Sequence, residues 1–452
     1  MQKEQRIKYY SINNYECIPQ VRLLSDELKY AINVVGKVLP FRINNYVVDE
    51  LIDWTKVPDD PMFKLSFLQR DFLSPEQFKS VENAIKRKAR TAEFKYLINQ
   101  IRLQLNPHPS GQLEHNTPTL EGIPIPGIQH KYQETVLVFP AAGQTCFTYC
   151  TFCFRWPQFT GDNSLKFASK QSPSFFEYIR KHKEVTDVLI TGGDPMVMNF
   201  RRIESIIRPL LGVGFEHIQN IRIGSKVLSL WPYRFISDQD ADNYLKLFED
   251  VNRSGKHLAF MAHFNHWKEL NTEATRKAVQ RILSTGTNIR CQSPMLKHIN
   301  DDAGIWKKMW QTQVQLGMIP YYMFIERDTG PKAYFETPLV KAFEIFRDAY
   351  QDVSGLARTV RGPSMSATPG KITIEGIDEI AGEKVIQLKF LQSRTPDWCN
   401  KIFFAQYDER ACWFDELVPA FGKKEFFFES NAFKPLSSKR KRLDVTPASL
   451  SY

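Results

Sequence analysis

Between residues 135 and 351, short apolar runs alternate with longer amphipathic stretches, and this rhythm constrains the fold more than any other feature of the sequence. The runs are rich in β-branched and aromatic residues, which favour strands, and the stretches between them have the spacing of surface helices. Strands that alternate with helices at roughly 30–40 residues per unit predict βα units and a parallel sheet. The predicted strands are Thr135–Phe139, Asp187–Thr191, Ile218–Ile223, Leu258–His263, Asn288–Cys291 and Pro320–Ile325.

Six such units are fewer than the eight of a complete TIM barrel, so we expect an α/β fold built on a partial (βα)6 barrel. In barrels of this type the chemistry lies at the carboxyl ends of the strands. The stretches expected to pack as helices against the strands include Phe200–Leu211, Asp238–Glu249, Asn271–Leu283 and Leu339–Gln351.

The segments before and after this alternating region differ from it in composition. Residues 1–125 lack strand alternation, and Ser74 before Pro75 is typical of a helix N-cap followed by proline at the first helical position. We predict a mainly helical N-terminal region before the barrel, an aromatic-rich extension after it, and a basic, disordered tail at the end. The predicted boundaries are 1–125, 126–375, 376–436 and 437–452.

Hydropathy and charge exclude several classes of protein. No apolar stretch approaches the roughly 20 residues that span a bilayer, and Met1–Lys8 begins with charged residues instead of a signal-peptide pattern. The net charge of +10 is concentrated in residues 86–95 and 434–442, so it does not describe an extended nucleic-acid groove. These features predict a cytoplasmic protein with no membrane segment and no nucleic-acid partner.

Three of the seven cysteines lie close together directly after the first predicted strand, as Cys146-Phe-Thr-Tyr-Cys150-Thr-Phe-Cys153. Three thiolates on one loop can converge on an iron–sulfur cluster, and three ligands for four irons leave one iron open. Two alternatives remain at this point: a tetrahedral zinc site completed by His130 or a distant cysteine, and cysteines that only pack in a core. The position at a strand-to-loop transition favours a cluster that takes part in catalysis.

The segment Thr191-Gly-Gly-Asp-Pro195 follows the second predicted strand. Glycine allows the backbone to approach a ligand closely, because no Cβ intervenes. Together with the cysteine loop, this segment resembles the signature of the radical S-adenosylmethionine (SAM) enzymes. The resemblance implies a 4Fe-4S cluster held by the three cysteines, with SAM bound to the open iron and against Gly192, Gly193 and Asp194.

Further segments within residues 125–375 resemble, in order, the lysine 2,3-aminomutase family of radical SAM enzymes. They are Cys153–Arg155, Asp187–Asp194, Arg222–Lys226, His263–His266, Arg290–Gln292, Asn300-Asp301, Pro320–Tyr322 and Thr337-Pro338. Members of this family bind pyridoxal 5′-phosphate (PLP) through a lysine in a Gly-rich segment, which here matches Ala367-Thr-Pro-Gly-Lys371. The resemblance implies a SAM-derived 5′-deoxyadenosyl radical, and migration of an amino group from C2 to C3 of an amino acid bound to PLP.

The resemblance also assigns roles to individual side chains. Arg155 matches an arginine near the substrate carboxylate, where a planar guanidinium suits bidentate binding. Lys131 and Tyr132 match positions beside the PLP phosphate and ring, and Gln292 matches a glutamine near SAM and PLP. A lysine that attacks PLP must be partly desolvated, so we expect Lys371 to point into the barrel mouth. The family further implies a small amino-acid substrate, an electron donor of flavodoxin or ferredoxin type, and a homo-oligomer.

Two positions depart from the lysine-specific pattern. Ungapped alignment of the flanking segments places Arg327 and Ser364 where lysine-specific members carry aspartates that hold the distal ammonium of the substrate. A desolvated ammonium opposite a guanidinium is left unpaired or repelled, so these residues favour an acidic substrate such as glutamate. Glu326 and Asp328 flank the arginine, and a shift of one residue would restore an acid there.

Two further departures concern bound groups. The Gly-rich run before Lys371 is thinned to Ala-Thr-Pro-Gly, which leaves the contacts of the PLP phosphate unassigned. Cys399 and Cys412 do not match the closely spaced cysteines that bind zinc in some family members, so no zinc site is predicted. Two alternative functions remain: a radical SAM enzyme that modifies an RNA or protein recruited by the basic stretches, and a non-catalytic iron–sulfur module.

Overall fold

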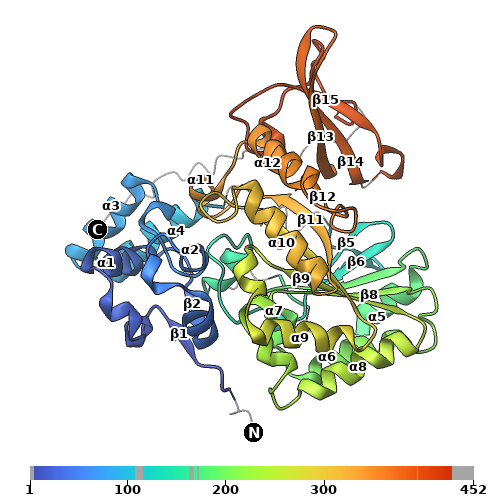
Figure 1. The fold of residues 1–452 in the computed structure, drawn as a ribbon, viewed down its shortest axis with the longest axis horizontal. Helices are drawn as coiled ribbons and strands as arrows, with labels where there is room; N and C mark the ends of the chain where they lie inside the picture. The colour runs from blue at the N-terminus through green and yellow to red at the C-terminus, as the bar shows by residue number, and fades with distance from the viewer. Residues whose placement is uncertain (1–4, 107–115, 162–166, 170–172, 394, 430–452) are drawn as a thin grey trace, which may run out of the picture.

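The computed structural model describes residues 5–106, 116–161, 167–169, 173–393 and 395–429, and the predicted basic tail at 437–452 lies outside this part of the chain. The predicted mixed α/β fold is confirmed, and Figure 1 shows helices packed beside one large sheet. Among the described residues, no helix is both long enough and apolar enough to cross a bilayer.

The large sheet has eleven strands, and their order in space follows their order in the chain from β5 to β15. Strands β6 to β12 are parallel, whereas β5 at one end and β13–β15 at the other are antiparallel to their neighbours. The bounds are β5 (Ile128–Tyr132), β6 (Thr135–Val138), β7 (Asp187–Ile190), β8 (Asn220–Ser225), β9 (His257–His263), β10 (Asn288–Met295), β11 (Ile319–Ile325), β12 (Arg361–Ser366), β13 (Gly370–Ile380), β14 (Glu383–Ser393) and β15 (Ile402–Gln406).

All six predicted strands are present, as β6 to β11. The parallel strand β12 was not predicted, because Arg361-Gly-Pro-Ser-Met-Ser366 lacks an apolar alternation and contains Gly and Pro, which usually weaken a strand. The central residues of β12 are nevertheless buried, since neighbouring strands cover them on both sides. Burial by neighbouring strands thus overrides the weak local propensity.

The helices that follow the parallel strands are amphipathic and begin at polar caps. Asn199 accepts a hydrogen bond from the Arg202 backbone at the start of α6, and Thr272 and Asp302 cap α9 and α10 in the same way. The helices are α5 (Pro173–Lys181), α6 (Phe200–Ile207), α7 (Val227–Leu230), α8 (Ala241–Arg253), α9 (Glu273–Leu283), α10 (Ala303–Gln315), α11 (Lys332–Phe335) and α12 (Leu339–Gln351).

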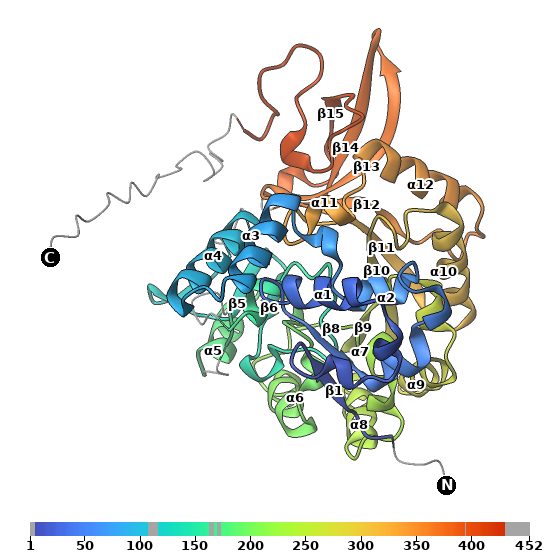
Figure 2. The ribbon, with the colours of Figure 1, turned by 90° about the vertical axis from the view of Figure 1, so that its left-hand side faces the viewer.

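The N-terminal residues form a layer of helices across the sheet (Figure 2). Ser74 caps α3 in a capping box with Gln77, and Pro75 occupies the first turn, which confirms the predicted N-cap. The side chains of this layer share one apolar core with the sheet. The elements are β1 (Tyr9–Ser11), α1 (Asp26–Val35), β2 (Arg42–Asn44), α2 (Pro61–Ser66), α3 (Pro75–Lys86) and α4 (Thr91–Gln104), and the short strands β3 (Thr119–Leu120) and β4 (Ile123–Pro124) follow.

The two faces of the sheet differ in character. On β8, Ile221 and Ile223 are fully buried in the core, whereas the alternate residues Arg222 and Gly224 point to the opposite face, here called the inner face. The two ends of the sheet approach each other, because Gln392 Nε2 on β14 donates to Glu134 Oε1 in the turn between β5 and β6 at 3.3 Å. The inner face is therefore concave at this point.

Candidate functional site

The cysteine loop follows β6 and is held by the N-terminal layer. The backbone N–H of Tyr149 donates to the Arg42 carbonyl at 2.9 Å, and that of Thr151 donates to the Leu65 carbonyl at 3.1 Å. The fully buried Asn44 donates through Nδ2 to the Phe147 carbonyl at 3.2 Å. These contacts fix the backbone on which the thiols are mounted.

The three thiols of this loop are free, and each of the cysteines is partly buried. Burial raises the pKa of Cys146 well above its usual value, that of Cys150 to about 12 and that of Cys153 to about 11. Cys146 lies close enough to the other two thiols that each of them raises its pKa further. Three buried thiolates repel one another unless a cation neutralises them, so the donor set fits a soft, positively charged iron–sulfur cluster. In the described part of the chain, however, no three His, Cys, Asp or Glu side chains are already arranged to hold a single metal ion.

The glycine-rich turn after β7 packs directly on the start of the cysteine loop. A Cβ on Gly193 would lie 2.5 Å from the Thr145 carbonyl oxygen, so only glycine fits there. The Asp194 N–H donates to the same oxygen at 2.7 Å. The Asp194 carboxylate accepts from Ser225 Oγ at 2.7 Å and from the Lys226 N–H at 2.9 Å. In this structure these residues join the cysteine loop to β7 and β8, and burial raises the pKa of Asp194 to about 6.

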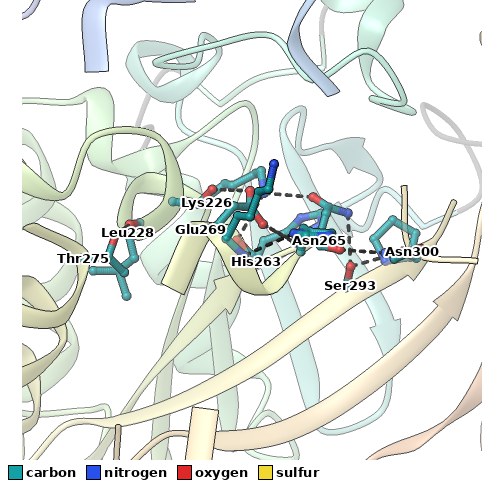
Figure 3. A network of polar contacts seen from close by, with 12 residues as sticks. Lys226, Leu228, His263, Asn265, Glu269, Thr275, Ser293 and Asn300 are labelled. Atoms are coloured by element: carbon teal, nitrogen blue, oxygen red, sulfur yellow. Dashed lines mark hydrogen bonds and ion pairs between the residues drawn. The ribbon is translucent and has the colours of Figure 1, made fainter. Parts of the chain in front are cut away.

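A buried polar network lies at the carboxyl ends of β8, β9 and β10, beside the cysteine loop (Figure 3). Lys226 Nζ donates to Glu269 Oε1 at 2.6 Å and to Asn265 Oδ1 at 2.9 Å. Glu269 also accepts from the Ser229 hydroxyl and from the His266 N–H. This ion pair is almost completely withdrawn from solvent, and Lys226 and Glu269 line a small cavity that Cys150 and the N-terminal layer also line.

His263, at the end of β9, differs from its neighbours in this network. Its Nε2 is buried and has no hydrogen-bond partner among the described residues, although its ring contacts Phe152 of the cysteine loop at 5.7 Å between centroids. Burial lowers the pKa of His263 well below its usual value, and the nearby Lys226 lowers it further. Gln292 pairs with His263 across β10 and β9. A buried nitrogen without a partner is costly, so this corner suits a ligand with hydrogen-bonding groups.

Two arginines approach the ring of Phe154, which follows the cysteine loop. The guanidinium carbon of Arg155 lies 4.9 Å and that of Arg327 5.3 Å from the ring centroid. Burial lowers the pKa of Arg155 to about 10, and the neighbouring Arg327 lowers it further, against the opposing effect of Cys153. The Arg155 guanidinium makes no hydrogen bond or ion pair within the described ranges, but it does lie over Phe139. Two buried cations side by side favour the binding of an anion.

The other residues that the alignment placed near the substrate have different surroundings. Ser364 is fully buried, and its hydroxyl donates to the Met323 carbonyl at 3.3 Å, so it belongs to the wall of the site. Glu326 is also buried, and desolvation raises its pKa well above the usual value. Tyr132 lies close enough to Arg327 to raise the pKa of that guanidinium, and Lys131 Nζ lies 5.4 Å from the Tyr132 ring.

Lys371 lies at the start of β13, paired with Ser366 on β12 and Gln392 on β14. Its Nζ donates to Gln392 Oε1 at 3.0 Å and lies 4.2 Å from the centroid of the Tyr322 ring. Burial, together with the smaller effects of Arg222 and Arg361, lowers the pKa of Lys371 to about 7. A large fraction of this amine is therefore neutral near pH 7, as nucleophilic attack on an aldehyde requires.

The structure thus gathers the predicted residues into two groups. Near the cysteine loop lie Arg155, Gly192, Gly193, Asp194, Gln292 and Arg327. Lys371 lies with the side chains of β8, β11, β12 and β14. The sequence analysis missed several partners that complete these groups: Arg42, Asn44, Glu134, Asn265, Glu269 and Gln392. Asn265 lies in the segment His263–His266 but received no role there, and the other partners lie in no recognisable local pattern. Each of the six contacts a residue at least 20 positions away in the sequence.

Comparison with known proteins identified related sequences. The chain is 36% identical over 293 residues to an Aquifex aeolicus protein named "Putative L-lysine 2,3-aminomutase", a match that covers 65% of this chain and 74% of that protein. It is 30% identical to the L-lysine 2,3-aminomutases of Fusobacterium nucleatum and Bacillus subtilis, over 52% and 56% of this chain. These two matches cover 52% and 51% of the relatives, so the chain spans about half the length of either protein.

Other comparisons add little. No protein-family model matches the chain. Among solved structures, the crystal structure of Streptococcus suis SuiB bound to the precursor peptide SuiA matches with a TM-score of 0.34 and 11% sequence identity. That match covers 69% of this chain and 66% of SuiB, and at this level of similarity it carries no argument.

Proposed function

Because the chain belongs to the lysine 2,3-aminomutase family, we propose that it is a radical SAM, PLP-dependent amino-acid 2,3-aminomutase that acts on an acidic amino acid such as glutamate. The observation that carries the substrate class is the pair of partly buried guanidiniums, Arg155 and Arg327, beside the ring of Phe154.

The cofactors of this proposal fit the residues at the carboxyl ends of the strands. When bound, a reduced 4Fe-4S cluster with SAM supplies a 5′-deoxyadenosyl radical, and PLP holds the migrating amino group and delocalises the unpaired electron. Cys146, Cys150 and Cys153 would hold the cluster, because they are buried soft donors on a rigidly held loop. His263 and Gln292 would face SAM, since His263 Nε2 has no partner within the described chain.

The two arginines would bind the two carboxylates of the substrate. Arg155 lies two residues after the cysteine loop and would orient the α-carboxylate, so that the β-carbon is presented to the radical. Arg327 follows β11 and would bind the side-chain carboxylate. Both guanidiniums are desolvated, so each would gain a charge-assisted, bidentate contact that water does not already satisfy. A lysine substrate would bring its distal ammonium against Arg327 and be repelled.

Lys371 would hold PLP covalently between turnovers. Its largely neutral amine near pH 7 is prepared for attack on the aldehyde, and Gln392 orients it without adding a negative charge. The buried ring of Tyr322 would shield one side of this amine from water. The protein would therefore orient the reactants and limit the access of water, and the cofactors would supply the chemistry.

Several broader features belong to the same proposal. We propose that the parallel strands form the partial (βα)6 barrel of a radical SAM enzyme, with support from the contact between Gln392 and Glu134 across the two ends of the sheet. A cytoplasmic location would keep the thiols reduced. A flavodoxin- or ferredoxin-type protein would supply the electron, and the enzyme would act as a homo-oligomer on a small molecule, not on nucleic acid.

The test of the substrate class compares amino acids and one variant. Anaerobically reconstituted protein is assayed with lysine, glutamate, aspartate, arginine and alanine, with 5′-deoxyadenosine and the β-amino acid as readouts. We expect turnover of an acidic substrate, and we expect Arg327→Gln to raise its KM about 10- to 100-fold, the cost of one charged hydrogen-bonding partner. Arg276→Gln is the matched control, because Arg276 is exposed on α9 and, among the described residues, hydrogen-bonds only to Asn271. Efficient turnover of lysine alone would refute the substrate class.

A further inference from the structure

A group of arginines on the inner face lies away from the cysteine loop and close to Lys371. Arg222, Arg290 and Arg361 come from β8, β10 and β12, each from the first half of its strand. The guanidinium carbons of Arg290 and Arg361 lie 5.2 Å and 5.3 Å from the centroid of the Tyr321 ring. Burial raises the pKa of Tyr321, and each of the three arginines lowers it. All three therefore lie close to this side chain.

A β-bulge creates this arrangement. The register of β10 and β11 shifts between Cys291 and Gln292, where Pro320 and Tyr322 are the successive partners. Tyr321 is therefore the extra residue of β11, and it lies beside Tyr322, 4.5 Å away between ring centroids. The arginines of β8, β10 and β12 lie close to these two adjacent rings of β11.

The positive charge of this group is only partly compensated. Arg222 is paired with Asp187 at 2.7 Å. In the described chain Arg290 makes no hydrogen bond or ion pair, and Arg361 donates only to the Tyr322 hydroxyl, at 3.4 Å. Guanidiniums that face one another without a carboxylate are unfavourable unless an anion binds between them.

Lys371 connects this group to the proposed cofactor. Its Nζ lies 4.2 Å from the Tyr322 ring, and the Arg361 guanidinium carbon lies 5.8 Å from the same ring. In PLP the aldehyde and the phosphate ester are carried by neighbouring ring carbons, so an aldehyde at Lys371 brings the phosphate close to the lysine. Within the thinned Gly-rich run, the Cβ of any other residue at Gly370 would lie 2.3 Å from the Gln392 carbonyl oxygen, so this glycine packs against β14. Gly370 is required for the pairing of β13 with β14.

We infer that Arg290 and Arg361, assisted by Arg222, bind the phosphate group of the PLP whose aldehyde reaches Lys371. This inference rests on the proposed function and adds phosphate-binding residues to Lys131 and Tyr132, which the family resemblance places beside the PLP phosphate and ring. The guanidinium fork matches a phosphate dianion bidentately, and two forks from neighbouring strands converge on one anion. The occupant is recognised as a phosphate dianion, whether it arrives on PLP or as free phosphate.

The experiment compares PLP with pyridoxal, which carries the same aldehyde but no phosphate. Covalent attachment to Lys371 in the anaerobic protein is followed by absorbance and by mass after borohydride reduction, so no turnover is required. We expect wild-type protein to bind PLP about 100-fold more tightly than pyridoxal, and Arg290→Gln or Arg361→Gln to lower this ratio of PLP to pyridoxal affinity at least about tenfold. Arg276→Gln is the control, and Arg290→Lys, which keeps the charge but loses the fork, should recover part of the affinity.

Each outcome decides a separate point. Equal ratios of PLP to pyridoxal affinity in wild type and in both glutamine variants would overturn the arginine site while leaving Lys371 as the PLP residue. Attachment of neither aldehyde to wild-type protein would overturn the proposed function. In that case calorimetry with inorganic phosphate tests the arginine site. Binding to wild-type protein that Arg290→Gln abolishes would support a site for free phosphate. Equal binding to both proteins, or binding to neither, would overturn the site.

Discussion

Two buried lysines on the inner side of the sheet have opposite surroundings. Lys226, at the end of β8, has Glu269 at 2.6 Å and the Asn265 amide oxygen at 2.9 Å, and its carboxylate partner is in turn fully hydrogen-bonded. Lys371, at the start of β13, has one neutral amide oxygen and two arginines nearby, and Glu134 acts on it more weakly than either arginine. Lys226 therefore belongs to an ion pair whose partners all come from the protein, whereas positive charges outnumber negative charges around Lys371.

The difference indicates two roles: Lys226 stabilises the fold around the candidate site, and Lys371 is placed to react with a ligand. A charge whose partners are all supplied by the protein holds backbone segments together, and here it ties β8 and β9 together beside the cysteine loop. A charge whose partners are missing is ready for a ligand, and burial then shifts its pKa toward the neutral form. Three predictions test this distinction, in order of decreasing effect.

The largest effect is expected from Glu269→Ala. Removal of one member of a buried ion pair leaves the Lys226 ammonium uncompensated, so the free energy of unfolding should fall by about 3–5 kcal/mol. Urea denaturation of the anaerobic apoprotein measures it. The control is Glu121→Ala, which breaks the exposed pair with Lys181 at 3.1 Å and should cost about 0–1 kcal/mol.

A double variant makes this prediction sharper. Lys226→Met combined with Glu269→Leu removes both charges, so it should recover much of the stability that Glu269→Ala loses. Equal stability of Glu269→Ala and Glu121→Ala would contradict the closed ion pair and remove the contrast between the two lysines.

The second prediction concerns the pH dependence of Lys371. With a pKa of about 7, its reactive neutral fraction should fall about tenfold per pH unit below pH 7 and become constant above it. The rate of covalent attachment of pyridoxal between pH 5 and 9 measures this profile. An ordinary lysine would react faster with every step up to pH 9, and such a profile would contradict the effect of burial. Arg361→Gln should move the plateau to higher pH, because Arg361 lowers the pKa of Lys371.

The smallest effect is expected from Asp187→Asn. This change frees Arg222 from its only carboxylate partner among the described residues, so the arginine group becomes more positive. PLP should bind about two- to fivefold more tightly, in line with the energy of a partly exposed ion pair, and pyridoxal should be unaffected. Weaker PLP binding with normal pyridoxal binding would show that Asp187 positions Arg222, and that charge alone does not set the affinity.

The sequence predicted those parts of the fold that depend on local pattern. The apolar runs of β6 to β11 and the N-cap at Ser74 were recognised because they follow from alternation and capping chemistry. Strand β12 was missed because its burial depends on neighbouring strands.

The candidate site divides in the same way. The cysteine loop and Lys371 are found in short contiguous segments, so their residues could be named from the sequence. Glu269 and Gln392 could not, since their importance depends on contacts with Lys226 and Lys371 that only the tertiary fold creates. The substitution at Arg327 was visible by alignment, but the shared ring of Phe154 that brings it near Arg155 was not.

The contacts between β2, α2 and the cysteine loop have a consequence for the order of biogenesis. Arg42, Asn44 and Leu65 are synthesised before the loop at residues 146–153, so their segments can fold while the loop is still in the ribosome. The emerging loop then meets an existing template that sets the path of its backbone. Under the proposed function, the cluster would therefore be assembled on a loop whose backbone these contacts hold, and an N-terminal truncation would impair assembly even though it removes no cysteine ligand.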